Sequence, residues 1–257
     1  MAVSIDAVYQ KVLAFANKEQ RGYITPQEFN LFAHQAQMEI FEQYFYDVNQ
    51  WTRQHGNDSA YSDMLTNLQE KIDLFNTYVP RVNIIDEFGV FDMDSIPNLH
   101  RIGRIGVTYD SHPNLKNQIA EYVTFEEDSL HIGSSLVKPT KKRPTYTRFL
   151  NPSGRKFIKI SPIPQKPVLL ANGSYDYTDT VQVFYTRKPK FPNWNYVVVN
   201  DKALYNSTES TDFELHPSEE SELVYRILAF AGISMQKPNL TQTAAGLEQA
   251  KVQQEKQ

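Results

Sequence analysis

Residues 17–28 have the spacing of the calcium-binding loop that joins the two helices of an EF-hand. Gly22 stands where such a loop turns sharply, and Glu28 stands where a bidentate carboxylate closes the site. Further oxygen ligands would come from Asn17 and Glu19. A calcium-binding module is therefore one interpretation of this stretch, and calorimetry with calcium would test it.

The same residues also fit a purely structural interpretation. Arg21 places a cation where a calcium loop needs an oxygen ligand, and such loops gain affinity from several converging carboxylates. Gly22 then serves as the turn between two helices, while Thr25 and Glu28 form the capping box that begins the second helix. We adopt this interpretation and predict no metal and no other cofactor.

A second chemically suggestive stretch is strongly basic, because residues 129–175 contain no Asp or Glu. Clustered Lys and Arg with interleaved aromatic residues, here Tyr146 and Phe149, are a common composition for contacts to nucleic-acid phosphates. A charge run can equally cover an acidic neighbouring subunit or lie in solvent, and these cases are the more common. We treat the run as a candidate for a DNA channel or a subunit interface. Its members are Lys138, Lys141, Lys142, Arg143, Arg148, Arg155, Lys156 and Lys159.

No residue set typical of catalysis accompanies these two stretches. The six histidines are scattered without the spacing of a zinc site, and the chain has no cysteine to act as nucleophile or ligand. The sequence contains no Gly-rich phosphate loop and no nucleophile elbow. Asp92 and Asp94 form a carboxylate pair beside Pro97, a position typical of an exposed loop edge. We predict that the protein is not an enzyme.

Composition indicates a folded chain. Of the 257 residues, 40% are hydrophobic and 22% are charged, which is typical of globular proteins with one large or two small domains. The net charge of -4 argues against a dedicated nucleic-acid binder. The N-terminus lacks the pattern of a signal peptide, and no stretch is apolar enough to span a bilayer. We therefore expect a soluble protein without a membrane partner.

The elements that would position these residues begin with helices. Residues 5–16 repeat apolar side chains at the three- and four-residue spacing of one helical stripe. A second helix starts at Pro26, directly after the capping residue Thr25, and continues toward Trp51 without glycine or a further proline. A third apolar stripe covers residues 61–75. We predict a helical bundle over residues 1–79 with one long helix.

After residue 80 the apolar pattern alternates and prolines become frequent, which favours strands joined by extended loops. The clearest hairpin covers residues 146–161, because Asn151-Pro152-Ser153-Gly154 has turn chemistry. We predict a β-rich domain over residues 80–211. Its strand candidates are residues 89–93, 99–109, 121–125, 129–132, 146–150, 155–161, 180–186 and 196–199.

The C-terminal part of the chain returns to helical patterns. Pro217 begins a helix with an acidic first turn, and Gly232 is placed to end it. We predict that this C-terminal helix, within residues 212–236, packs on the bundle. Residues 237–257 are expected to form an extended, flexible tail that becomes ordered only against a partner. The predicted fold class is α+β, with a helical bundle, a β-rich middle domain, a C-terminal helix and a flexible tail.

Aromatic residues make up 12% of the chain, and many of them fall in predicted loops that a monomer would leave in contact with water. Buried aromatic side chains dominate the energetics of protein interfaces. A large core within a proline-rich β domain explains the same residues equally well, so both interpretations remain open. The residues concerned are Tyr109, Tyr175, Tyr177, Phe191, Trp194, Tyr196 and Tyr205.

Two segments of the chain resemble a group of virion structural proteins from crAss-like and related short-tailed phages. Residues 2–33 read AVSIDAVYQKVLAFANKEQRGYITPQEFNLFA, and residues 212–220 read DFELHPSEE. The middle of the chain, residues 80–210, carries least of the resemblance. The order of the segments is also similar to that of phage head-to-tail adaptors, in which helix bundles pack side by side around a channel.

The resemblance implies a structural protein of the virion without enzymatic activity, assembled in the host cytoplasm. It implies a homo-oligomeric ring of roughly twelve copies at the neck, which joins the portal protein to other neck and tail ring proteins. DNA would pass non-specifically through the channel. No residue-level site transfers, because scaffold motifs define the group. The alternatives are a virion receptor- or carbohydrate-binding protein, associated with a tail spike and using aromatic loops, and the calcium-binding module.

Overall fold

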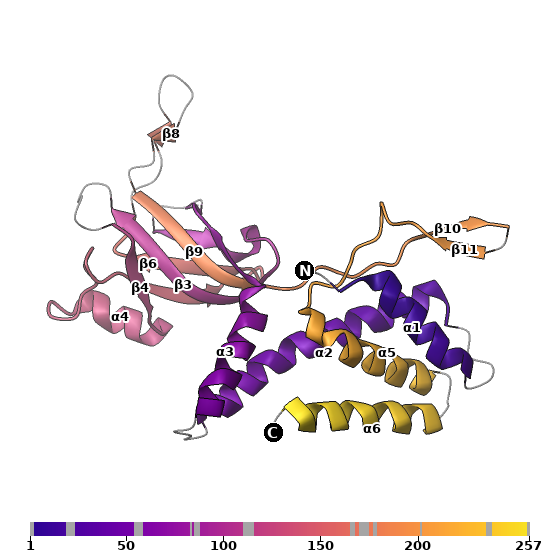
Figure 1. Cartoon of the computed structure of the whole chain (residues 1–257). Helices are drawn as coiled ribbons and strands as arrows, with labels where there is room; N and C mark the ends of the chain where they lie inside the picture. Colours follow the sequence, from indigo (N-terminus) through magenta and orange to yellow (C-terminus); the bar gives the residue numbers. More distant parts are fainter. Residues whose placement is uncertain are drawn as a thin grey trace. The chain divides into compact units, whose positions relative to one another are not determined.

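The computed structural model divides the chain into two compact units, each with its own core. We call Met1–Leu74 together with Pro189–Gln257 the helical unit, and Phe75–Lys188 the sheet unit. Both units are visible in Figure 1, and the mixed α+β fold class predicted from the sequence is confirmed. The structure describes residues 3–18, 24–53, 59–82, 84, 88–109, 116–164, 168–169, 175–176, 179–200, 202–234 and 238–255.

The helical unit combines elements from both ends of the chain. A β-bridge between Val3 and Phe213 joins the N-terminal segment to the C-terminal one. Its helices are α1 (Ile5–Lys18), α2 (Pro26–Arg53), α3 (Ser59–Asp73), α5 (Glu220–Ser234) and α6 (Pro238–Glu255), with the 3-10 turn η2 (Pro217–Glu219) before α5. The strands β10 (Tyr196–Val199) and β11 (Lys202–Tyr205) form a separate antiparallel hairpin.

The long helix α2 begins where the sequence predicts. The Thr25 hydroxyl accepts a hydrogen bond from the backbone N–H of Glu28 at 3.3 Å, and the Glu28 carboxylate accepts one from the backbone N–H of Thr25 at 3.0 Å. These reciprocal bonds satisfy backbone groups that have no partner inside the helix. The buried stripe of α2, which includes Phe29, Ala33 and Ile40, packs against α5.

The C-terminal region differs from the prediction in two ways. Helix α5 continues through Gly232 to Ser234, so Gly232 does not end the helix as predicted. The predicted flexible tail is wrong for residues 238–255, which form α6 and pack along α5 (Figure 1). Residues 238–255 therefore pack against α5, a helix of the same unit.

The sheet unit is built around one sheet of seven strands in the order β1-β9-β3-β4-β5-β6-β2. All neighbouring pairs in it are antiparallel except β4 and β5, which are parallel. Its strands are β1 (Asn76–Val79), β2 (Val90–Asp92), β3 (Leu99–Tyr109), β4 (Gln118–Tyr122), β5 (Thr145–Leu150), β6 (Lys156–Ser161) and β9 (Asp179–Arg187). The unit also holds η1 (Met93–Ser95), α4 (Phe125–Gly133) and the short pair β7 (Val168–Leu169) and β8 (Tyr175–Asp176).

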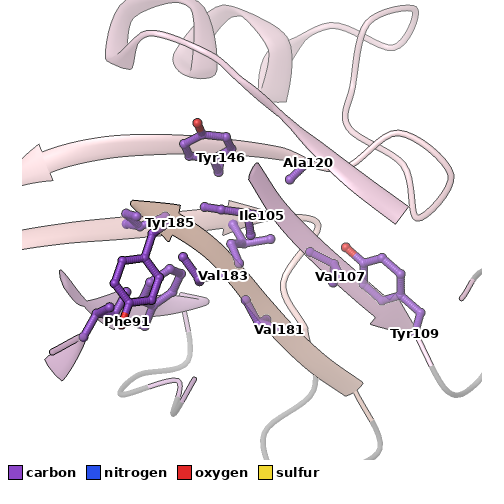
Figure 2. Packing of buried hydrophobic residues seen from close by; sticks show 12 residues of the cluster. Phe91, Ile105, Val107, Tyr109, Ala120, Tyr146, Val181, Val183 and Tyr185 are labelled. Atoms are coloured by element: carbon purple, nitrogen blue, oxygen red, sulfur yellow. The ribbon is translucent and has the colours of Figure 1, made fainter. Parts of the chain in front are cut away.

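Alternating side chains of this sheet form the core of the unit. Ile105, Val107 and Tyr109 are buried at every second position of β3, facing Val181 and Val183 of β9. Figure 2 shows these side chains together with Phe91, Ala120, Tyr146 and Tyr185 of neighbouring strands. The period-two pattern in the sequence therefore corresponds to one buried face of the sheet.

The hairpin predicted over residues 146–161 is confirmed as β5 and β6. The turn is closed by a hydrogen bond from the Gly154 backbone N–H to the Asn151 carbonyl at 2.8 Å. Gly154 has a φ of +77°, a conformation that side chains disfavour. Asn151 and Gly154 thus form the turn that the sequence predicts.

One predicted strand, residues 129–132, is wrong because this segment lies within α4. Thr124 and Glu127 form a capping box in front of that helix, which is the same device that begins α2. Strand β4 ends at Tyr122, so the predicted strand over residues 121–125 is only partly correct. Strands β1, β7, β8 and β11 appear outside the predicted strands, and β1 falls within the range predicted as helical bundle.

The unit boundaries also differ from the predicted domains. The sheet unit ends at Lys188, whereas the β-rich domain was expected to reach residue 211. The hairpin of β10 and β11 consequently belongs to the helical unit. Among the loop aromatics, Tyr109 and Trp194 are buried and serve as core, while Phe191 and Tyr205 are exposed. Tyr177 and the side chain of Tyr175 lie outside the described residues.

Candidate functional site

The residues with calcium-loop spacing are placed as follows. Asn17 lies in α1, but its side chain and Glu19 fall outside the described part of the structure. The Glu28 carboxylate accepts hydrogen bonds from the hydroxyl and the backbone N–H of Thr25, at 2.7 and 3.0 Å. These hydrogen bonds hold the pKa of Glu28 below its ordinary value. Glu28 therefore has a structural task as a helix cap.

The basic run does not form one surface, because its members on β5 and β6 point to opposite faces of the sheet. Arg148 pairs with the buried Ile158, whereas Lys159 pairs with Thr147 on the other face. Lys159 donates to the Asp128 carboxylate of α4 at 2.9 Å. The Arg148 guanidinium lies over the ring of Tyr122, 5.1 Å from its centroid. Two of the predicted cations are thus held by neighbours within the unit.

Most of the remaining basic residues follow α4 and precede β5 in the sequence. Arg155 approaches Asp92 at 3.9 Å, and the ammonium of Lys141 lies 5.6 Å from the centroid of the Tyr109 ring. Four others are exposed and make no ion pair with any described residue. They are Lys138, Lys142, Arg143 and Lys156. The available positive charge is therefore concentrated in residues 138–143, with Lys156 on β6.

The carboxylate pair Asp92 and Asp94 has a local role. Asp92 accepts a hydrogen bond from the Asp94 backbone N–H at 2.8 Å and caps the 3-10 turn η1. The Asp92 carboxylate therefore organises a turn at the end of β2, to which Asp94 contributes its backbone N–H.

The helical unit contains a groove of about 390 Å³ between α2, α3 and the segment before α5. Its apolar lining comes from Trp51 of α2 and from Met64 and Leu68 of α3. The polar lining consists of Gln43, Asp47, Asn67, Glu70, Lys71, His216 and Ser218. An apolar floor with polar walls is the usual composition of sites that bind a small molecule or an anchoring side chain.

Next to this groove, charged side chains are buried at the start of α5. Glu219 is only 1% exposed, and its carboxylate binds the ammonium of Lys71 at 2.6 Å. Lys251 of α6 lies 3.5 Å from both Glu219 and Glu222. Because buried charges are costly unless they are paired, these contacts fix α3, α5 and α6 in one arrangement.

Arg226 extends this buried ion network along α5. Its guanidinium lies 2.7 Å from Glu222, 3.5 Å from Glu39 of α2 and 3.2 Å from Glu248 of α6. It also donates to the side-chain oxygen of Gln43, a residue that lines the groove. Arg226 therefore links α5 to α2 and α6.

The two buried glutamates have pKa values shifted in opposite directions. Burial alone would raise the pKa of Glu219, but the hydrogen bond and charge of Lys71, with help from Lys251, lower it. Burial raises the pKa of Glu222, and the negative charge of Glu219 adds to this against the attraction of Arg226. Glu219 is the carboxylate that stays ionised most readily.

This network joins helices α2, α3, α5 and α6. Within the described ranges, no group of three or more His, Asp or Glu side chains could hold a metal ion. Sequence reasoning identified Glu219 only as part of an acidic first turn. The pair Glu222 and Arg226, four residues apart on one helix face, was a detectable signal for an ion pair. Partners that are distant in sequence, such as Lys71, had no such signal.

Comparison with models of known protein families finds no match, and comparison with curated proteins finds none either. Among the helices of the described residues, none has the length and apolar character needed to cross a membrane.

Proposed function

We propose that this chain is a structural protein of a tailed-phage virion that forms a ring at the head-to-tail connector. Its activity is assembly: it joins the portal protein to neighbouring neck and tail rings and leaves a channel for DNA. The proposal rests on the resemblance of residues 2–33 and 212–220 to virion structural proteins. It also rests on apolar side chains that each unit exposes.

The exposed apolar hairpin of β10 and β11 is the structural observation that most strongly supports this proposal. Near its base, the rings of Tyr196 and Tyr205 stack on Trp194, with centroids 5.7 and 5.8 Å apart. Farther out, Val197, Val198 and Leu204 are more than half exposed, and they occupy both faces of the hairpin. An isolated two-stranded hairpin is at best marginally stable in water. A projecting apolar hairpin is therefore suited to a neighbouring subunit that would cover it.

Closed rings of identical subunits need two different surfaces that fit each other. The hairpin lies on the helical unit, while a separate set of exposed apolar residues lies on the sheet unit. The latter include Phe125 and Leu130 of α4 and Leu136 in the following turn. Two unlike apolar surfaces on one chain are consistent with head-to-tail contacts between copies.

The assembly can be tested with purified protein, alone and mixed with the portal protein of the same phage. We expect rings with one fixed number of copies in native mass spectrometry and electron micrographs. Val197→Asp combined with Leu204→Asp should reduce assembly while circular dichroism shows an unchanged fold. Ser207→Asp, at the exposed turn after β11, is the matched control. A protein that stays monomeric at high concentration with portal present would contradict the proposal.

A further inference from the structure

The turn after α4 presents the most exposed large hydrophobic side chain of the described residues. Leu136 is 95% exposed, and its neighbour Val137 is 54% exposed. The backbone N–H of Lys138 donates to the carbonyl of Ser134 at 3.1 Å, which closes a helix-like turn around both residues. We call Leu136 and Val137 the apolar turn. Its apolar side chains are held outward by a hydrogen-bonded backbone, as an anchoring contact requires.

The apolar turn is surrounded by positive charge. Lys138 follows it directly, and Lys142 and Arg143 lie in the next turn, closed by hydrogen bonds between Thr140 and Arg143. The three cations are exposed and make no ion pair with any residue that the structure describes. A surface that receives this turn should therefore offer an apolar hollow with acidic walls.

The groove of the helical unit has that composition. Trp51, Met64 and Leu68 form its apolar lining, and its volume of about 390 Å³ has room for two aliphatic side chains. Its walls include the carboxylates of Asp47 and Glu70.

Further acidic residues lie on the two helices that form the groove. Asp63 lies on the same stripe of α3 as Glu70, and Glu42 lines a shallower depression beside the groove on α2. Among the described residues of the groove wall the one lysine is Lys71, which is paired with Glu219.

We propose that the groove of one copy receives the apolar turn of a second copy, with the cations of residues 138–143 facing the carboxylates of α2 and α3. This inference rests on the proposed ring function and names the contact that joins neighbouring subunits. Because the turn and the groove lie on different units, the contact is head-to-tail and can be repeated around a ring.

The absence of native cysteine makes the contact directly testable by disulfide trapping. Leu136→Cys is mixed with a size-tagged Asn67→Cys protein, since Asn67 lines the groove on the exposed side of α3. We expect mixed disulfide dimers under mild oxidation. Gln69→Cys, also exposed on α3 but absent from the groove lining, is the matched control and should give only background dimers.

Charge exchange supplies a second measurement. Glu70→Lys should weaken association in sedimentation experiments at least fivefold, and adding Lys138→Glu should recover part of that loss. Both side chains are exposed, so the fold should be preserved. Weakening without recovery would contradict the proposed pairing.

The outcomes separate this contact from the ring itself. Suppose that the wild-type protein forms rings but Leu136→Cys and Asn67→Cys give no more mixed dimers than the Gln69→Cys control. That result would overturn the contact and leave the ring function standing. Trapping in assemblies that never close would support the contact and overturn the ring. If neither mixed disulfide dimers nor rings form, both proposals are overturned.

Discussion

Arg226 shows how single side chains organise the helical unit. Its guanidinium faces Glu222, Glu39 and Glu248, which lie on three different helices. Replacing a complete buried ion pair with apolar groups is often harmless, but removing one member leaves an uncompensated charge. The raised pKa of Glu222 indicates that its charge is already costly and depends on this partner.

We expect Arg226→Met to lower the free energy of unfolding by about 3 kcal/mol, because the buried carboxylate of Glu222 loses its nearest counter-charge. Urea unfolding followed by circular dichroism would measure the loss. Lys11→Met is the control, since the Lys11–Glu220 pair is largely exposed and such pairs contribute about 0–1 kcal/mol. Equal effects of the two substitutions would refute a special role for Arg226.

Glu219 should make stability depend on pH. Because its native pKa lies below the ordinary value of 4.5, its ion pairs stabilise the fold above that value. The stabilisation disappears as the pH falls through the lowered native pKa. In urea titrations from neutral to acidic pH, the stability difference between wild type and Glu219→Gln should therefore shrink. A difference that stays constant across this window would show that the carboxylate charge is not responsible.

At the scale of elements, the β5–β6 turn shows where backbone conformation limits substitution. Gly154→Ala should destabilise the protein by about 1 kcal/mol, because alanine disfavours the positive φ found there. Gly133→Ala, at the end of α4, is a matched control: an added Cβ meets nothing within 4 Å at either site. Thermal unfolding should show a lower midpoint for the first variant only.

Elements with local signals could be predicted from the sequence, and elements that depend on distant partners could not. Pro26 and its capping box marked the start of α2, and alternation marked β3 over its full length. Thr124 and Glu127 carry the same capping signal before α4, but a short alternating run after them favoured a strand. The polar helix α6 depends on pairs such as Lys251 with Glu222, which only the fold brings together.

The same distinction applies to the candidate site. The basic run was detectable by composition, yet its members on β5 and β6 divide between two faces of the sheet because strand side chains alternate. The groove brings together α2, α3 and residues 216–218, which are far apart in sequence. No local sequence pattern could have predicted that these three segments form a groove together.

At the scale of the whole molecule, the sheet unit is a continuous insertion between two halves of the helical unit. Replacing residues 75–188 by a short Gly-Ser linker between Leu74 and Pro189 should leave the helical unit folded, since it keeps its own core. We expect a helical circular dichroism spectrum and one cooperative unfolding transition. The excised sheet unit should unfold cooperatively as well. Loss of cooperativity in both fragments would show that neither core is self-sufficient.

The ends of the insertion adjoin, because the backbone N–H of Arg187 donates to the carbonyl of Phe75 at 2.9 Å and β1 pairs with β9 beside them. A segment attached in this way can change in length or sequence, or be replaced entirely, because its two ends stay close together. The distance that the flanking halves of the helical unit must span is then unchanged. The middle segment can therefore vary while the two terminal segments of the chain are preserved, and chimaeras with foreign middle segments should remain expressible.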